Sequence, residues 1–393
     1  RAQSAGMEEE AAKNSLLPAI LWRNSVDTAK IFCVNGDYLA DISAVGILDA
    51  MMGETYDYDI YPVINAQNLV IADLPAFVSE NEEEMQKRYS QSAQAVYQEI
   101  VWPSLTSIAS RTGAKMTCMM TPQFTYTDEE EPDGENVTYY LKRLKEEHAE
   151  AGLSADSREG IPLSEKIKQD QTFWQTYAPS YRFLSLYADG VKSIGEESAL
   201  PAEIRTVALG SGASGQAVGY LNENVTLQPS TSSGIRHTFL DDFKVKCMET
   251  ALGYSNITLD FYSVTYPEGD EDSWEKMSKK IAANLGTYWK AYEAFDATTL
   301  TESDVRIRRF LALDYKQQRA GNVITLSLEH REDAAWFLLR LHGEKVTEVA
   351  GGIFEEIEDG VYLILAEEDE VSVEVQTGET WQYQDGGKRG DGT

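Results

Sequence analysis

Apolar and polar residues follow one another in blocks that predict strands and helices in turn. Residues 68–71 form a short apolar run, typical of a buried strand, and this strand ends at Asp73. Residues 79–113 are amphipathic and begin with acidic residues, so they predict a long helix with a break near Pro103. Residues 114–124 predict the next strand. The chain therefore begins as strand, helix, strand.

The same alternation continues through the middle of the chain. Two longer segments have the spacing of helices and three shorter ones have the composition of strands; they are residues 136–152 and 162–190, and residues 204–210, 225–231 and 256–267. Alternation of this kind implies a parallel sheet with helical crossovers, either open or closed into a barrel. We therefore predict an α/β fold, with a (β/α) barrel domain over residues 18–320.

The pattern changes at about residue 321 to short apolar strands separated by tight turns. Asp359-Gly360 is a strong signal for a β-hairpin turn between two such strands. The spacing of the strands predicts a second domain over residues 321–378, a small antiparallel β-sandwich.

The charge of the chain narrows its range of partners. It has 34 Lys and Arg against 65 Asp and Glu, a formal net charge of −31, which repels nucleic acid and acidic membrane surfaces. No apolar run approaches 18 residues, so we expect no membrane-spanning segment. A cationic polymer would be attracted, although the acidic residues could equally serve only to keep the protein soluble.

Residues for familiar catalytic chemistry are sparse. There are four histidines, at positions 148, 237, 330 and 342, and no two have the spacing of a metal-binding pair. The chain has no GxSxG motif of a serine hydrolase. Residues 210–215 fit GxGxxG, but we interpret them as a flexible loop because no acidic residue follows at the expected place. We expect neither a metal nor a cofactor.

Several stretches together resemble a known family. They are "YPVINAQNLVIADLPAF", "EEHAEAGLSAD", "DFYSVTYPEGDEDSWEKM" and "AAWFLLRLHG" followed by "GGIFEEIEDGVYLI". In their order and context they resemble the polysaccharide deacetylase-like proteins encoded with Pel-type exopolysaccharide genes, which are relatives of the carbohydrate esterase deacetylases. The resemblance covers most of residues 18–375 and implies a deacetylase-like barrel.

The resemblance also implies which chemical groups have been lost. Active members have two adjacent carboxylates at the end of the first strand, and here Ala72 stands in place of the base beside Asp73. The segment "AGLSADSREG" lacks the expected histidine pair, and Tyr266-Pro267-Glu268 replaces a His-Pro-Asp. Without a base, water activation loses a factor of roughly 10²–10⁴. The resemblance therefore implies a degenerate deacetylase site.

Our leading hypothesis is a bacterial protein, extracellular or at the cell surface, that binds an amino-sugar exopolysaccharide or proteins of its assembly machinery. The candidate ligand-binding residues are Asp73, Glu150, Asp156, Asp241, Asp242, Tyr266, Glu268 and Trp274, with Trp102, Trp174 and Tyr181 as further aromatic candidates. An alternative is an active deacetylase or glycosidase with a rearranged carboxylate site. A purely structural scaffold is a third possibility.

Overall fold

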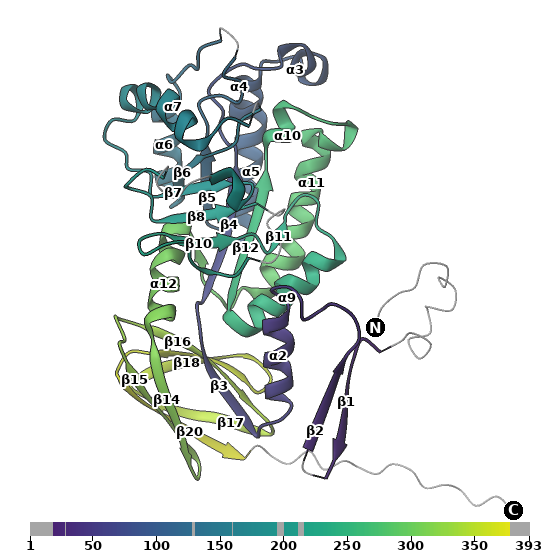
Figure 1. Ribbon diagram of the computed structural model, residues 1–393, viewed down its shortest axis with the longest axis vertical. Helices are drawn as coiled ribbons and strands as arrows, with labels where there is room; N and C mark the ends of the chain where they lie inside the picture. The colour runs from purple at the N-terminus through teal and green to yellow at the C-terminus, as the bar shows by residue number, and fades with distance from the viewer. Residues whose placement is uncertain are drawn as a thin grey trace, which may run out of the picture. The chain divides into compact units, whose positions relative to one another are not determined.

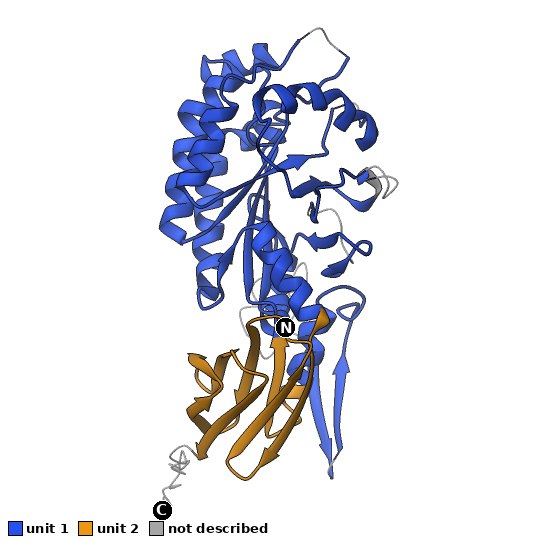
Figure 2. Ribbon diagram, turned by 90° about the vertical axis from the view of Figure 1, so that its left-hand side faces the viewer, with its two compact units in different colours: residues 1–51, 63–311 blue, residues 52–62, 312–393 orange. Residues whose placement is uncertain are grey.

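The computed structural model describes residues 19–377 except 28, 128–129, 159, 195–199 and 211–215. The chain divides into two compact units, which Figure 2 shows in different colours. The first consists of residues 1–51 and 63–311, and the second of residues 52–62 and 312–393. The second unit thus includes residues 52–62 and begins again at Ala312, whereas the sequence pattern had placed residues 18–320 in one domain.

In the described part of the chain no helix is long and apolar enough to cross a membrane.

A ten-stranded sheet forms the centre of the first unit (Figure 1). Its order is β11-β12-β4-β5-β6-β7-β8-β10-β9, with β13 paired to β4. Every pairing from β11 to β10 is parallel, and only β9 runs antiparallel to its neighbour. The strands are β4 (Ala66–Ala72), β5 (Met116–Met120), β6 (Glu150–Ser154), β7 (Ser185–Ala188), β8 (Thr206–Leu209), β9 (Gly219–Tyr220), β10 (Thr226–Pro229), β11 (Ser232–Ser233), β12 (Tyr254–Asp260) and β13 (Ala297–Thr298). A separate hairpin precedes them, formed by β1 (Leu21–Val26) and β2 (Ala29–Val34).

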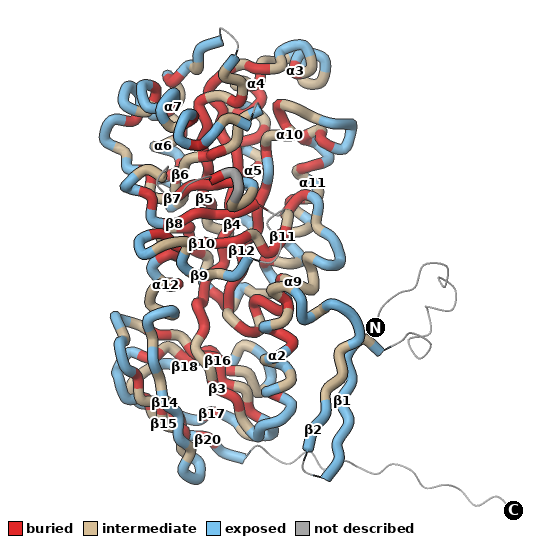
Figure 3. Tube along the Cα trace, viewed as in Figure 1, coloured by how far each residue is buried: buried red, intermediate tan, exposed pale blue. Residues whose placement is uncertain are grey.

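Helices follow most of the parallel strands, as the sequence pattern predicts. They are α2 (Ala44–Gly53), α3 (Glu82–Tyr89), α4 (Ala93–Val96), α5 (Trp102–Thr112), α6 (Val137–Glu146), α7 (Leu163–Tyr177), α8 (Val191–Ile194), α9 (Phe239–Leu252), α10 (Tyr262–Thr265), α11 (Trp274–Asn284) and α12 (Leu300–Ala312). The largest core cluster of the unit contains residues of α5, α6 and α11 together with residues of β4, β5 and β12. Burial of this apolar layer accounts for the largest part of the stabilisation. It appears as the continuous buried trace along the strands in Figure 3.

The sheet is curled but open among the described residues, because its strand order begins at β11 and ends at β9 without a pairing between them. The predicted barrel is therefore present as a half-barrel, and its closure is not seen. A second cluster fills the hollow side of the curve. It joins Ala72, Tyr187 and Ala208 of three strands to Leu300 at the start of α12. The carboxyl end of β4 thus lies against a packed interior.

The second unit has two four-stranded sheets, β14-β15-β20-β17 and β18-β19-β16-β3. Its strands are β3 (Tyr58–Val63), β14 (Asp314–Ala320), β15 (Val323–Glu329), β16 (Ala335–Leu341), β17 (Glu344–Ala350), β18 (Gly352–Glu358), β19 (Val361–Ala366) and β20 (Glu370–Thr377). Residues from both sheets share one core cluster, including Ile60, Phe337 and Val373. Antiparallel sheets that pack their apolar faces together form a sandwich, in agreement with the prediction from the strand spacing.

Three local predictions differ from the structure. The apolar stretch before Asp73 contains two strands, β3 and β4, which belong to different units and are separated at Asn65, where φ is +56°. The predicted long helix over residues 79–113 is interrupted at Ser90, and the predicted break near Pro103 is present as a π-helical segment, Tyr97–Val101, that directly precedes α5. Residues 136–152 and 162–190 each end in a strand, β6 and β7, that the helical pattern concealed.

Candidate functional site

Four aspartates meet at the carboxyl edge of the parallel sheet. Asp73 directly follows β4, Asp189 directly follows β7, Asp260 is the last residue of β12, and Asp156 comes two residues after β6. Because these strands run parallel in one sheet, their carboxyl ends lie at the same edge, which is where α/β proteins place ligands. In agreement with this, the charges of Asp156 and Asp260 act on the pKa of Asp73, and the charge of Asp189 acts on the pKa of both Asp156 and Asp260. We call these four residues the aspartate cluster.

Asp73 is the most deeply buried member of the aspartate cluster, with no exposed surface. Its φ of +60° lies in the left-handed region, which Asp tolerates better than most residues. Its Oδ1 accepts a hydrogen bond from Ser154 Oγ at 2.6 Å. Its Oδ2 is also buried and receives no hydrogen bond from an N–H or hydroxyl donor of the described residues, while the Asp156 carboxyl group lies within hydrogen-bonding reach of Asp73. A buried oxygen without a donor is costly, so it marks a place where a ligand or a proton completes the site.

Asp156 and Asp73 are both hydrogen-bonded to the Ser154 hydroxyl group. The backbone N–H of Asp156 donates to Ser154 Oγ at 3.1 Å, so one hydroxyl group links both residues. Burial, with added repulsion from Asp260 and Asp189, raises the pKa of Asp156 to about 7. Burial and the charges of Asp156 and Asp260 raise the pKa of Asp73 well above its usual range. Burial thus favours the protonated form of both carboxyl groups.

Asp189 and Asp260 form the solvent-exposed rim of the aspartate cluster. Burial also raises the pKa of Asp260, because protein atoms crowd one side of its carboxylate although the other side meets solvent. Asp260 Oδ1 accepts a hydrogen bond from the Tyr262 N–H at 2.9 Å. A Cβ atom at Gly210 would come within 2.7 Å of both Asp189 Oδ1 and Tyr187 Oη, so glycine leaves room for the ends of these two side chains.

The nearest cations are already engaged by other acids. Lys166 Nζ is buried and donates to Asp170 at 3.1 Å, to Thr121 at 3.0 Å and to Tyr126 at 2.6 Å. Arg236 is exposed and lies 3.3 Å from Asp272. Both cations oppose the rise of pKa in the aspartate cluster. The charge of Lys166 acts to lower the pKa of Asp73 and Asp156, and the charge of Arg236 acts to lower that of Asp260. Neither forms an ion pair with the cluster, which therefore keeps an excess of negative charge.

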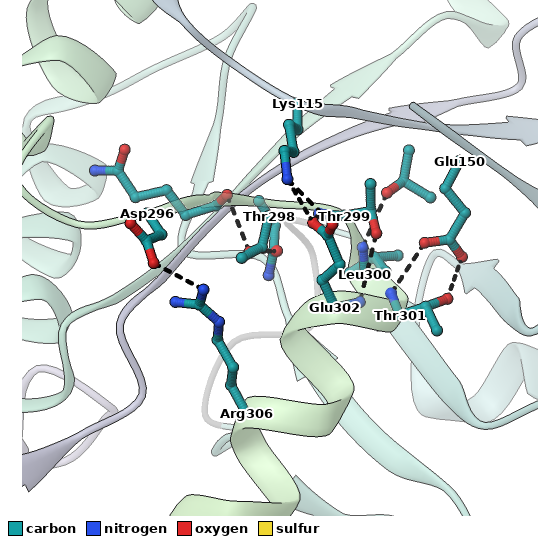
Figure 4. A network of polar contacts seen from close by, with 12 residues as sticks. Lys115, Glu150, Asp296, Thr298, Thr299, Leu300, Thr301, Glu302 and Arg306 are labelled. Atoms are coloured by element: carbon teal, nitrogen blue, oxygen red, sulfur yellow. Dashed lines mark hydrogen bonds and ion pairs between the residues drawn. The ribbon is translucent and has the colours of Figure 1, made fainter. Parts of the chain in front are cut away.

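Two of the eight candidates from the sequence, Asp73 and Asp156, lie in the aspartate cluster. Glu150 lies at the opposite edge, because it begins β6 rather than ending it. There it accepts hydrogen bonds from Ser185 Oγ at 2.6 Å, from Thr301 Oγ1 at 2.6 Å and from Thr301 N–H at 2.9 Å. Figure 4 shows Glu150 pointing toward the first turn of α12, beside the ion pair of Lys115 with Glu302.

The other candidates have structural partners. Asp241 forms a capping box with Thr238 at the start of α9, and Asp242 pairs with Lys246 at 2.9 Å. Glu268 is exposed and lies 3.9 Å from Arg236. Trp274 is buried in the core.

Tyr266 and the further aromatic candidates serve packing and loop structure. The Tyr266 hydroxyl group donates to Glu80 Oε2 at 2.6 Å, while Glu80 Oε1 accepts the N–H groups of Phe124 and Thr125. Burial raises the pKa of Tyr266 to about 12. Trp102 and Trp174 pack edge-on against neighbouring rings, and the Tyr181 hydroxyl group bonds to Ala151. These rings therefore have structural roles.

Sequence reasoning missed Asp189 and Asp260. Asp189 was hidden because its strand was read as part of a helix, and Asp260 because residues 256–267 were read as one strand, although β12 ends at Asp260. A usable signal was present in both: an Asp directly after the apolar runs "SLYA" and "NITL". The same signal had identified Asp73.

The arrangement suits acid–base chemistry or the binding of an ammonium group more than the binding of a metal ion. In the described ranges, no group of three or more His, Cys, Asp or Glu side chains is placed to hold a metal ion. Most of the glycine-rich segment at 210–215 lies outside the described residues, so the interpretation of that segment stays a prediction. Asp156, with a pKa raised to about 7, is a carboxyl group that can give and take a proton near neutral pH.

Comparisons with known proteins give distant similarities. Residues 8–159 match the model of a family described as "Uncharacterised protein conserved in bacteria (DUF2194)". No curated protein matches the chain. Among solved structures, one similar chain is assigned as a polysaccharide deacetylase from Mycobacterium smegmatis, with a TM-score of 0.38, 9% identity, and coverage of 62% of this chain and 90% of that chain.

Two further solved structures show similarity at the same level. One is assigned as a glycoside hydrolase/deacetylase from Parabacteroides distasonis, with a TM-score of 0.37, 10% identity, and coverage of 71% of this chain and 82% of that one. The other is an endo-β1,6-glucanase, with a TM-score of 0.32, 9% identity, and coverage of 87% and 90%.

Proposed function

We propose that the first unit is a catalytically degenerate, deacetylase-like domain that binds a cationic amino-sugar polymer at the aspartate cluster. The observation that carries the proposal is the convergence of four carboxyl groups from four strand ends, with the buried Asp73 Oδ2 left without an N–H or hydroxyl donor in the described chain. An ammonium group is the ligand that such a set attracts, because it is a compact donor that satisfies several carboxylate oxygens at once.

The residues that surround Asp73 support the degenerate character that we propose. The position before it is Ala72, which is fully buried and packs against Tyr187 and Leu300. No second carboxylate therefore stands beside Asp73 in the chain to act as a base. Of the four histidines, His330 and His342 belong to the second unit, and His237 stacks on Tyr288 at 3.6 Å. The site consequently has the charge to bind but lacks the expected set of groups for metal-dependent deacetylation.

The choice of an amino-sugar polymer rests on the sequence resemblance to deacetylase-like proteins of Pel-type exopolysaccharide clusters, together with the net charge of −31. Such a polymer carries positive charge wherever its amines are free, and the acidic protein attracts it over long distances. On this proposal the protein acts outside the bacterial cell or at its surface, in a biofilm matrix, beside proteins that assemble the polymer.

A titration with a glucosamine hexamer tests the proposal. We expect Asp260→Asn to weaken binding about tenfold, because a charge-assisted hydrogen bond contributes about 1.4 kcal/mol or more. Asp242→Asn is the matched control, since it removes the same charge from α9 outside the aspartate cluster, and it should leave affinity nearly unchanged. Failure of the parent protein to bind the hexamer at millimolar concentration, or equal loss in both variants, would refute the proposal.

A second candidate function, hydrolysis of a glycan, is favoured by one observation: the pKa of Asp156 is raised to about 7 beside the buried Asp73. A carboxyl group with such a pKa is suited to general acid–base catalysis. Assays for reducing ends and for acetate, run from pH 5 to pH 9, separate the two functions. Turnover with a maximum near pH 7 that is lost in Asp156→Asn would establish the hydrolase, whereas binding without turnover supports the degenerate site.

A further inference from the structure

The second unit contains a cavity that the aspartate cluster does not involve. Its volume is about 710 Å³, within the range of roughly 300–1,000 Å³ usual for small-molecule sites. All of its lining residues belong to residues 52–62 and 312–377, so the cavity lies within one unit. The walls come from the segment leading into β3, from β14, from the turn between β16 and β17, and from the end of β20.

One wall of the cavity presents an open aromatic ring. Tyr56 lines the cavity and is 56% exposed, with Met52 beside it also half exposed. Tyrosine presents a flat apolar face together with a hydroxyl group, which is the combination that stacks on a pyranose ring.

The opposite wall is polar and held in place. The Arg319 guanidinium group makes two parallel hydrogen bonds to the Glu344 carboxylate, at 2.9 and 2.7 Å, and it lies over the Tyr58 ring at 5.3 Å. His342 Nε2 donates to the Gly53 carbonyl oxygen at 2.8 Å, which fixes the orientation of the imidazole ring. Polar groups that are already positioned lose little entropy when a ligand binds.

Other polar groups of the cavity remain available. The side chains of Asp57 and Gln317 line it and make no hydrogen bond to any residue that the structure describes. Asp59 is buried at its base, and burial raises the pKa of this carboxyl group. The cavity therefore offers both donors and acceptors, as vicinal hydroxyl groups require.

We propose that this cavity is a second glycan-binding site, which takes a neutral sugar residue stacked on Tyr56. The choice of a glycan rests on the function proposed for the first unit. A phosphorylated ligand is disfavoured by Asp57 and Glu344, and a purely apolar ligand would leave the polar wall unpaired. Arg319 and Glu344 neutralise each other, so the cavity does not require the positive charge that the aspartate cluster requires. The two sites then bind different parts of a partly acetylated polymer and raise its overall affinity through multivalency.

The test uses the full chain and a neutral N-acetylglucosamine hexamer in a calorimetric titration. We expect one site per chain, weakened at least tenfold by Tyr56→Ala and several-fold by Gln317→Ala. Ile353→Ala is the control, because it removes an equally exposed apolar side chain of the same unit outside the cavity. Melting curves of the variants should match the parent protein, because all three side chains are exposed.

The outcomes separate this inference from the function of the first unit. Asp260→Asn should leave binding of the neutral hexamer intact while weakening binding of the glucosamine hexamer. Absence of binding by the neutral hexamer at millimolar concentration, or binding that neither Tyr56→Ala nor Gln317→Ala reduces, overturns the second site and leaves the first untouched. Binding of the neutral hexamer alone would support the cavity and refute the aspartate cluster as a site.

Discussion

The two edges of the parallel sheet carry carboxylates in opposite states. At the amino edge, Glu150 accepts three hydrogen bonds and joins β6 to β7 and to the first turn of α12. At the carboxyl edge, Asp73 accepts one hydrogen bond and leaves Oδ2 buried without an N–H or hydroxyl donor in the described chain. The same chemical group thus stabilises the fold at one edge and costs stability at the other.

This difference indicates which edge of the sheet has interactions left to offer a ligand. A carboxylate whose hydrogen bonds are all made inside the protein has little left to offer a ligand, whereas a crowded group of acids has unmet interactions that a cation or a proton can supply. Natural proteins keep such unfavourable groups mainly at functional sites. The comparison therefore favours our proposal of a site at the carboxyl edge, and the following substitutions test it.

The largest effect is expected from adding an acid to the carboxyl edge. Ala72→Asp puts a carboxylate in a fully buried position beside the aspartate cluster, so it should lower the free energy of unfolding by about 3–5 kcal/mol at pH 8. No acetate release should appear, even with added zinc. Chemical denaturation and an acetate assay measure both results.

Ala72→Asn is the matched variant, because it adds similar bulk without charge. Its loss of stability should be smaller at pH 8, and the two variants should converge at pH 5, where the new acid is protonated. Zinc-dependent acetate release from Ala72→Asp would show instead that a metal site is intact.

Removing an acid from the amino edge should have the next largest effect. Glu150→Ala leaves the hydroxyl groups of Ser185 and Thr301 and one backbone N–H without an acceptor, at a cost of about 2 kcal/mol in the free energy of unfolding. Glu150→Gln keeps an acceptor oxygen and should cost less than half of that. Urea denaturation of the two variants is the measurement. An unchanged stability in Glu150→Ala would remove the structural half of the comparison.

Removing an acid from the carboxyl edge should raise the free energy of unfolding, by less than the loss expected at the amino edge. The pKa of Asp156 is about 7 in the folded protein against 3.8 in the unfolded chain, so the folded state holds the proton more tightly. Stability therefore falls as the pH rises from about 4 to about 7. Asp156→Asn avoids this loss and should be more stable than the parent at pH 8 by roughly 1–2 kcal/mol, a value reduced by its partial exposure.

The advantage of Asp156→Asn should shrink toward pH 4, where the parent carboxyl group is protonated too. Glu249, whose pKa burial raises to about 8, contributes the same trend in both proteins and cancels in the difference. Thermal melts across the pH range provide the check. A variant less stable than the parent at pH 8 would mean that the Asp156 charge is satisfied in the fold.

The sequence predicts the general architecture well because its strongest signals are local. The apolar run before Asp73 and the turn at Asp359-Gly360 identify a strand and a hairpin from neighbouring residues alone. By contrast, β7 has only four residues and follows a long amphipathic helix, so the helical pattern extended over it. Missing that strand also concealed Asp189, since a strand end defines the position of a site residue.

The location of Glu150 shows a second limit of sequence reasoning. Its neighbours in the chain look like those of Asp156, and both are acids within one short segment. Only the boundaries of β6 reveal that Glu150 begins this five-residue strand and that Asp156 follows its end, which directs them to opposite edges of the sheet. The partners of Glu150 are 35 and 151 residues away along the chain, a distance over which residue patterns carry no information.

The most direct test of the central claim, that the aspartate cluster binds cationic sugars, uses an O-aminoethylated glucose hexamer, whose primary ammonium groups keep their N–H donors and stay charged from pH 6 to pH 8. Since Asp156 ionises near pH 7, affinity should rise about tenfold from pH 6 to pH 8 in the parent protein. The rise should be lost in Asp156→Asn and kept in Glu150→Gln. An affinity that is independent of pH, or a rise that survives in Asp156→Asn, would contradict the account.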